Sequence, residues 1–223
     1  MDKNKAAYKL QNIPPIYYLN IDGQPERRQY IEEHFKHWEI ENYTRISAYD
    51  GRDDDLSDII KGRYPESMTS GEVGCTTSHL KAIKHWYDTS DSSYALIMED
   101  DIDLDIVKFW NFTWRDFMAN LPYDWDVVQL AIICTGSIHV KLHRRFVNDF
   151  STACYMINRH HAEKLLKFHE RNGKYKVLST ILLEKHDTIK KILRNILKNL
   201  IIAVVLGYLP CLSMDHSLTD LLH

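Results

Sequence analysis

Short apolar runs alternate along the chain with stretches in which apolar residues recur every three or four positions. Apolar runs bounded by polar sequence are typical of strands in a sheet that is covered on both faces. We expect such strands at residues 13–20, 43–47, 94–98, 125–133 and 151–157. Helical spacing predicts helices at residues 25–38, 69–87, 109–118 and 158–169. This order indicates an α/β fold with a mainly parallel central sheet flanked by helices.

The C-terminal part has a helical pattern from Lys174 to Leu209, with a basic polar side. The apolar run inside it, residues 200–209, is about half as long as a membrane span, so we interpret it as a buried or interfacial helix end. The basic side fits a solvated face, and peripheral contact with an anionic membrane surface is the alternative. We therefore divide the chain into an N-terminal tail (1–12), a core (13–170) and a helical C-terminal segment (171–223).

Composition allows one well-packed domain, since 44% of the 223 residues are hydrophobic and 26% are charged. The net charge of -3 and the dispersed lysines and arginines disfavour nucleic acid as a partner. The four cysteines lack the short paired spacing of zinc sites, and we expect reduced core thiols at Cys75, Cys134, Cys154 and Cys211. The first ten residues lack the apolar core of a signal peptide, which favours a cytoplasmic location.

Four carboxylates follow the strand that begins at Tyr94. If the chain stays extended, Glu99, Asp101 and Asp103 point one way and Asp100 points the other. Like charges this close repel one another unless a cation lies among them, and oxygen ligands suit Mg²⁺ or Mn²⁺. The alternative is a solvated acidic turn that caps the next helix. The pattern therefore predicts a candidate divalent-metal site.

Other polar residues follow the neighbouring predicted strands. Asn20 and Asp22 come at the end of the first strand, and Ala48 to Asp50 follow the second. Because the carboxyl ends of parallel strands meet at one edge, we expect these residues and the acids to line one cleft. Ser78 and His79 lie on the helix between, where a histidine is as readily structural as catalytic. Without a glycine-rich phosphate loop, the sequence predicts neither a dinucleotide site nor a P-loop.

Six stretches in fixed order carry a family resemblance. They are Tyr17–Asp22 with Arg27, Ile46–Arg52, Gly71–Cys75 with Ser78–His79, Leu96–Asp101, Asp124–Leu130, and Ala153–Ile157 with Ala162. Together they resemble glycosyltransferase family 25, the lipooligosaccharide and procollagen galactosyltransferase group. Each stretch alone is a weak signal, but six in order over residues 13–167 are specific.

The resemblance implies a GT-A-like nucleotide-sugar-binding fold and transfer of a hexose, galactose or glucose, from a UDP-sugar to a glycan or protein-linked hydroxyl. It also implies a divalent metal, Mn²⁺ or Mg²⁺, at the diphosphate, and a role such as lipopolysaccharide biosynthesis. Asp101 is the first expected metal ligand, with Glu99 or Asp103 as its partner. The residues expected at the donor are Asn20, Asp22, Ala48, Tyr49 and Asp50 near the nucleoside, and Arg27, Ser78 and His79 near the diphosphate.

Better-known family members transfer galactose with inversion, which requires a carboxylate to deprotonate the acceptor. Asp100 and Asp126 are the candidates for this base.

The similarity fades beyond Lys167, where members of the family carry an aspartate on a Pro-x-Asp-like turn and a final strand. The segment Met214–Leu218 is the nearest match, and we expect the C-terminal part to be shortened relative to the family. This departure motivates an alternative function, a non-catalytic relative that binds a sugar nucleotide or a partner. A phosphoryl-transfer enzyme is a third hypothesis, which the placement of all four acids after one strand disfavours.

Overall fold

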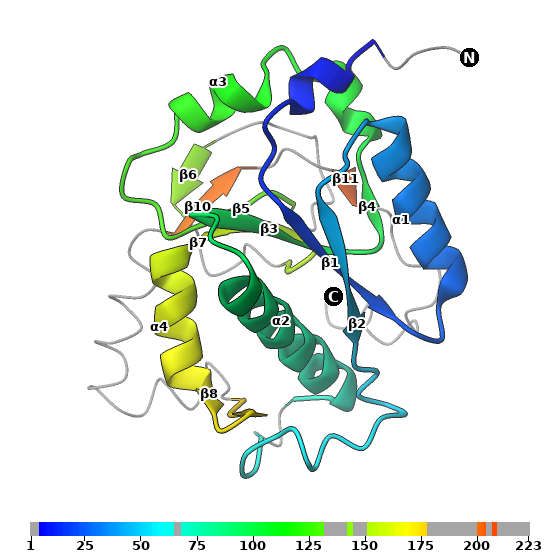
Figure 1. The fold of residues 1–223 in the computed structure, drawn as a ribbon, viewed down its shortest axis with the longest axis vertical. Coiled ribbons are helices and arrows are strands. Elements are labelled where there is room, and N and C mark those ends of the chain that lie inside the picture. The colour runs from blue at the N-terminus through cyan, green and yellow to red at the C-terminus, as the bar shows by residue number, and fades with distance from the viewer. Residues whose placement is uncertain are drawn as a thin grey trace, which may run out of the picture.

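The computed structural model describes residues 5–64, 68–131, 142–144, 151–177, 200–203 and 207–208. Its central strands are β1 (Ile16–Ile21), β2 (Tyr43–Ala48), β3 (Tyr94–Glu99), β5 (Val127–Gln129), β6 (Leu142–Arg144), β7 (Cys154–Asn158) and β10 (Leu200–Ala203). They form a seven-stranded sheet in the order β2-β1-β3-β7-β5-β10-β6 (Figure 1). Relative to β3, strands β1, β2, β5 and β10 run parallel, whereas β6 and β7 run antiparallel. The predicted α/β fold with a mainly parallel sheet is confirmed.

Helices cover both faces of this sheet. They are α1 (Pro25–His37), α2 (Ser70–Thr89), α3 (Trp114–Ala119) and α4 (Arg159–His169), with 3₁₀ helices η1 (Ala7–Leu10) and η2 (Asp105–Phe109). Figure 1 shows α2 and α4 side by side on one face. Along β1, Tyr18 packs with residues of α1 and α3, whereas its neighbours Tyr17 and Leu19 pack with residues of α2 and α4. This alternation buries both faces, as expected for a central strand.

Two helix starts follow from side-chain caps that the sequence displays. Thr69 accepts a hydrogen bond from the backbone of Glu72, whose side chain bonds back to Thr69, and α2 begins at the next residue. Asn158 caps α4 in the same way through the backbone N–H of His161. The helix expected at 109–118 is shorter than predicted, because Thr113 and Asp116 form a further capping box that starts α3 at Trp114.

The prediction of a helix over residues 174–209 is wrong wherever the structure describes that segment. Lys174–Tyr175 form β9, which pairs with β8 (Glu170–Arg171), and Gly207–Tyr208 form β11, which pairs with β4 (Ile102–Asp103). Leu200–Ala203 form β10, between β5 and β6. A short apolar run carries no helical period, and its β-branched isoleucines suit a strand. The basic residues at 185–198 and the segment Met214–Leu218 lie outside the described residues.

The structure also bears on the predicted N-terminal tail and on membrane-spanning helices. Leu10, in the predicted tail, is buried in the core that contains Phe35 and Trp114. None of the helices in the described ranges is both long and apolar enough to cross a bilayer.

Candidate active site

The carboxyl ends of β1, β2 and β3 lie at the same edge of the sheet. Leu19 is paired with Glu99, and Ile21 is paired with Ala48, so the residues that follow these strands emerge together. The segment before β7 reaches the same edge, because Glu99 N donates to Ala153 O at 2.7 Å. In α/β sheets this edge is where ligands bind.

Asp100 and Asp101 share one positive group. Arg27, on α1, donates from Nη2 to Asp100 Oδ1 and to Asp101 Oδ2, the second at 2.9 Å. Asn20 Nδ2 donates to the other oxygen of Asp100 at 2.7 Å, and Asn20 Oδ1 accepts from Arg45 Nε at 2.9 Å. Two neighbouring carboxylates therefore converge on a single cationic nitrogen, in a network that joins β1, β2 and α1.

Asp101 has an incompletely satisfied carboxylate. Its side chain is 12% exposed, and its Oδ1 has no hydrogen-bond partner among the described residues. Burial, and then the charge of Glu99, raise the pKa of Asp101 to about 6, although Arg27 opposes the shift. A buried carboxylate oxygen without a partner is costly, and a hard divalent cation would satisfy it. The residues present therefore fit the divalent ion that the family resemblance implies.

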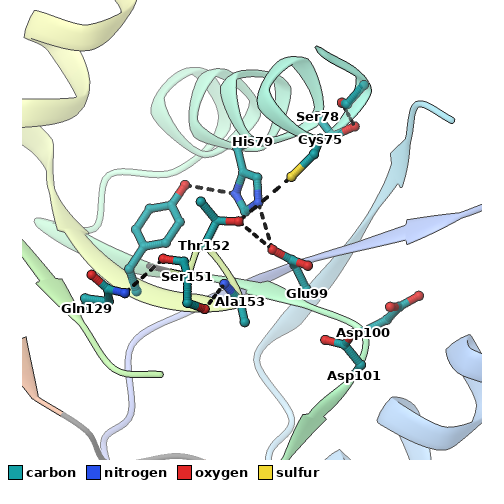
Figure 2. Close-up of polar contacts among 12 residues, drawn as sticks. Cys75, Ser78, His79, Glu99, Asp100, Asp101, Gln129, Ser151, Thr152 and Ala153 are labelled. Carbon is teal, nitrogen blue, oxygen red and sulfur yellow. Dashed lines mark hydrogen bonds and ion pairs between the residues drawn. The ribbon is translucent and has the colours of Figure 1, made fainter. Parts of the chain in front are cut away.

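Glu99 is turned toward α2, away from Asp100 and Asp101 (Figure 2). Its Oε1 accepts from Thr152 Oγ1 at 2.7 Å and lies 3.4 Å from His79 Nε2. The other ring nitrogen of His79, Nδ1, lies 3.1 Å from Tyr155 Oη. The chain thus uses Glu99 to join β3 to α2 and to the segment before β7.

His79 and Glu99 form a charged pair. Burial alone would lower the pKa of His79, but hydrogen bonds to Cys75 and Glu99 outweigh it and raise the pKa to about 9. Burial alone would raise the pKa of Glu99, yet His79 and Thr152 hold it below its ordinary value. Near neutral pH the pair is therefore imidazolium and carboxylate.

The expectation that Glu99, Asp101 and Asp103 share one face is wrong, because the chain turns after Glu99 instead of staying extended. Asp103, in β4, lies on the α1 side, where its ligand atom is within 4.8 Å of those of His34 and Asp105. The three predicted metal ligands are therefore divided among three surroundings.

The residues expected near a nucleoside are also brought to this edge. Asp22 accepts from Arg45 Nη2 at 2.5 Å and from Ser47 Oγ at 2.9 Å, and Arg45 lowers the pKa of Asp22. Asp50 pairs with Arg52 at 2.9 Å. The Lys81 ammonium donates to Ser47 O at 2.7 Å and lies 4.4 Å from the centre of the Tyr49 ring.

The turn after β2 rests directly on the backbone of α2. Tyr49 N donates to Ser78 Oγ at 2.8 Å, and Ser78 Oγ donates to Gly74 O at 2.7 Å. A Cβ at Gly74 would lie 2.4 Å from Gly51 N, and one at Gly51 would lie 1.8 Å from Ser70 O. Only glycines permit this approach. A cavity of about 720 Å³ adjoins the turn, with Gly51, Leu56, Tyr64 and Val73 among its lining residues.

Asp126 is not part of this site, which corrects its expected place in the cleft. It precedes β5, where Val127 pairs with Ile157, and Ile157 pairs in turn with Ala95. Asp126 is therefore level with Tyr94, at the start of β3, about 16 Å along the strand from Glu99 at ~3.3 Å per residue. Its Oδ2 lies 3.7 Å from His161 Nδ1 instead.

Sequence reasoning missed four residues that shape the site: Arg45, Lys81, Thr152 and Tyr155. Arg45 lies two positions before Ser47 in β2, so strand alternation could have placed it beside the residues after β1. Tyr155 lies in one of the matched stretches, whereas Thr152 just precedes it and carried no signal of its own.

Three comparisons relate the chain to known proteins. The sequence model of a family described as glycosyltransferase family 25 (LPS biosynthesis protein) matches residues 13–177. No curated protein matches the sequence. Among solved structures, one similar chain is titled a crystal structure of a glycosyltransferase involved in the glycosylation of the major capsid of PBCV-1. It has a TM-score of 0.40 and 9% identity, over 93% of this chain and 97% of that chain, too little similarity to bear on the site.

Proposed function

Since the chain belongs to glycosyltransferase family 25, we propose that it transfers a hexose, galactose or glucose, from a UDP-sugar to a glycan or protein-linked hydroxyl. We further propose a GT-A-like use of the fold, with Mn²⁺ or Mg²⁺ at the donor diphosphate. One observation carries this proposal: Asp101, at the ligand-binding edge of the sheet, keeps a buried carboxylate oxygen without a partner among the described residues.

Asp101 Oδ1 is the protein ligand that we propose for the ion. Mg²⁺ is usually held by one or two carboxylates together with substrate phosphates, so Asp101 with the donor diphosphate suffices. When bound, the ion would supply positive charge that stabilises the departing diphosphate. Arg27 would add a second positive group from α1, because its planar guanidinium suits phosphate oxygens as well as the carboxylates it now contacts.

The nucleoside would lie against the turn of Ala48 to Asp50. The adjoining cavity is of a size that suits a small ligand. Lys81 fixes the turn through Ser47 O and the Tyr49 ring, and Arg45 fixes Asp22 beside it. The hydroxyl of Ser78 is already used to hold this turn against α2, which supports a positioning role instead of direct contact with the diphosphate. His79 is likewise held by Glu99.

Asp100 is the carboxylate that we propose for removing the acceptor proton. Of the two candidates it alone lies at this edge of the sheet. Both of its oxygens accept a hydrogen bond, from Asn20 and Arg27, and each oxygen keeps a second lone pair that can take the proton. If Arg27 moves to the diphosphate of a bound donor, Asp100 Oδ1 loses a positive neighbour and becomes the better base.

A donor screen tests the proposal. UDP, GDP and CMP sugars are each supplied with Mn²⁺, and the released nucleotide is measured; titration calorimetry then follows UDP binding. We expect turnover of a UDP-sugar and its loss in Asp101→Asn, whereas Asp103→Asn, in a different cluster, stays close to the parent. The proposal fails if UDP and Mn²⁺ do not bind, or if Asp101→Ala binds them as well as the parent. Binding without any turnover would identify the non-catalytic alternative.

A further inference from the structure

Three different metal-ligating side chains meet between α2 and the end of β3. Cys75 and His79 come from α2, and Glu99 is the last residue of β3. One ligand atom of each lies within 4.8 Å of the other two. Figure 2 shows the sulfur, the imidazole ring and the carboxylate turned toward a common point.

The sequence and the neighbouring side chains both orient this group. Cys75 and His79 are four positions apart, so they lie on the same face of the helix. The Tyr155 hydroxyl lies 3.1 Å from His79 Nδ1, and the opposite nitrogen, Nε2, therefore faces Glu99. The Thr152 hydroxyl donates to Glu99 Oε1 at 2.7 Å and lies 3.8 Å from Cys75 Sγ. Outer partners of this kind fix the ligands of metal sites.

We propose that Cys75, His79 and Glu99 form a binding site for Zn²⁺, separate from the ion proposed at Asp101. Thiolate sulfur, imidazole nitrogen and carboxylate oxygen are the donors that zinc takes, whereas Mg²⁺ and Mn²⁺ favour oxygen alone. Three protein ligands leave a fourth position for water or another ligand. On binding, the thiol proton of Cys75 and the Nε2 proton of the His79 imidazolium are both released to solvent.

The site would connect three elements beneath the donor-binding edge. Its ligands join α2 to β3, and their outer partners come from β7 and the residues before it. Ser78, which holds the turn after β2, lies next to His79 on the same helix. Zinc bound here would therefore stabilise the protein and fix α2 against the sheet.

A second group of possible ligands provides a control. His34, Asp103 and Asp105 also lie within 4.8 Å of one another. Asp103 Oδ1 accepts a hydrogen bond from Asp105 N at 2.8 Å, and Asp105 Oδ2 accepts one from the Lys108 ammonium at 2.6 Å. These oxygens are already engaged and the group contains no thiol, so it does not match the donors that select zinc.

Cobalt spectroscopy tests the zinc site directly. The protein is stripped with EDTA and titrated with Co²⁺ alone, which gives a thiolate-to-cobalt charge-transfer band when a cysteine ligates it. We expect this band, its displacement by Zn²⁺, and its disappearance in Cys75→Ser. Thr152→Val should weaken Co²⁺ binding roughly 10-fold, as for outer partners of other metal sites. His34→Gln and Asp101→Asn are the controls and should keep the band.

The outcomes separate this proposal from the donor chemistry. No band in the parent, or a band that persists in Cys75→Ser, which keeps the other three cysteines, overturns the zinc site. Loss of Mn²⁺-dependent UDP binding in Asp101→Asn with the cobalt band intact supports two separate ions. If Cys75→Ser does not fold, alkylation of the parent replaces it. We then expect Zn²⁺ to slow the modification of Cys75, followed by peptide mass, at least ~10-fold, and an unchanged rate overturns the proposal.

Discussion

Two histidine–carboxylate pairs lie at opposite edges of the sheet and differ in charge. His79 and Glu99, 3.4 Å apart, lie at the carboxyl edge; His161 and Asp126, 3.7 Å apart, lie at the other. Both histidines are buried, yet the pKa of His79 is raised to about 9 and that of His161 is lowered to about 4. The same two kinds of side chain thus form a charged pair in one place and hold a neutral histidine in the other.

The surroundings explain the difference. Burial lowers the pKa of His161, Asp126 opposes this, and Lys164 and His160 add positive charge. Within the described part of the chain, His161 Nδ1 has no hydrogen-bond partner. At the carboxyl edge, hydrogen bonds outweigh burial for His79. Proximity of a histidine to an acid therefore does not mark a functional site, whereas a network that keeps both partners charged is a better indicator.

The largest effect should come from neutralising the acid at the carboxyl edge. Asp101→Asn keeps the shape but removes the charge proposed to hold the ion, and we expect turnover of the UDP-sugar to fall at least about 100-fold. Asp126→Asn, at the other edge, should stay within about twofold. Steady-state kinetics of released UDP measures both. Equal losses in the two variants would erase the functional contrast between the edges.

The next effect concerns the backbone contact on which the carboxyl edge is built. A Cβ in Gly74→Ala would meet Gly51 N at 2.4 Å and Tyr49 O at 2.8 Å, and neither backbone atom can rotate away. We expect the free energy of unfolding to fall by about 3 kcal/mol, the upper part of the range for overpacking. Gly71→Ala is the matched control, since nothing lies within 4 Å of its Cβ. Urea denaturation measures the free energy of unfolding of both variants. Equal values for the two would refute the close contact.

Local sequence signals predicted much of this fold. The apolar runs of β1 and β3 and the helix caps Thr69 and Asn158 involve neighbours in sequence, so their physics is visible in the chain. The strand β10 was not predicted. It pairs with β5, some seventy residues earlier in the sequence, and such a pairing depends on the whole sheet.

The candidate site was predictable as a set of strand ends and less so in its side-chain directions. Because the chain turns after Glu99, Asp100 and Asp101 both accept hydrogen bonds from Arg27. Nothing in the acidic run indicates that turn. Cys75 was interpreted as a core thiol, but it is only partly buried and faces a carboxylate more than twenty residues away. Residues so far apart in the sequence form no local motif, so the sequence alone does not show that they meet.

The pH dependence of stability distinguishes the neutral histidine. Because the pKa of His161 is depressed from 6.5 to about 4, the unfolded chain binds its proton first as the pH falls. The stability contributed by neutral His161 is therefore present above pH 6.5 and is lost as the pH falls toward 4, by about 2 kcal/mol between pH 7 and 5.

Urea denaturation at several pH values checks this. His161→Gln should show a drop in stability smaller by that amount, whereas exposed His160→Gln should behave like the parent. If His161→Gln lost as much stability as the parent between pH 7 and 5, His161 would be charged like His79, and the contrast between the edges would be lost.

The smallest effect isolates the role of Ser78 at the carboxyl edge. Its hydroxyl accepts from Tyr49 N, so Ser78→Ala leaves that amide without its partner and should cost about 1 kcal/mol of stability. Because the turn itself is proposed to bind the nucleoside, we expect the KM for the donor to rise severalfold while kcat changes little. Thr77→Ser is the control, since the hydroxyl that donates to Val73 O within the same helix is retained. A fall in kcat at constant KM would instead place Ser78 at the reacting diphosphate, as the family resemblance first suggested.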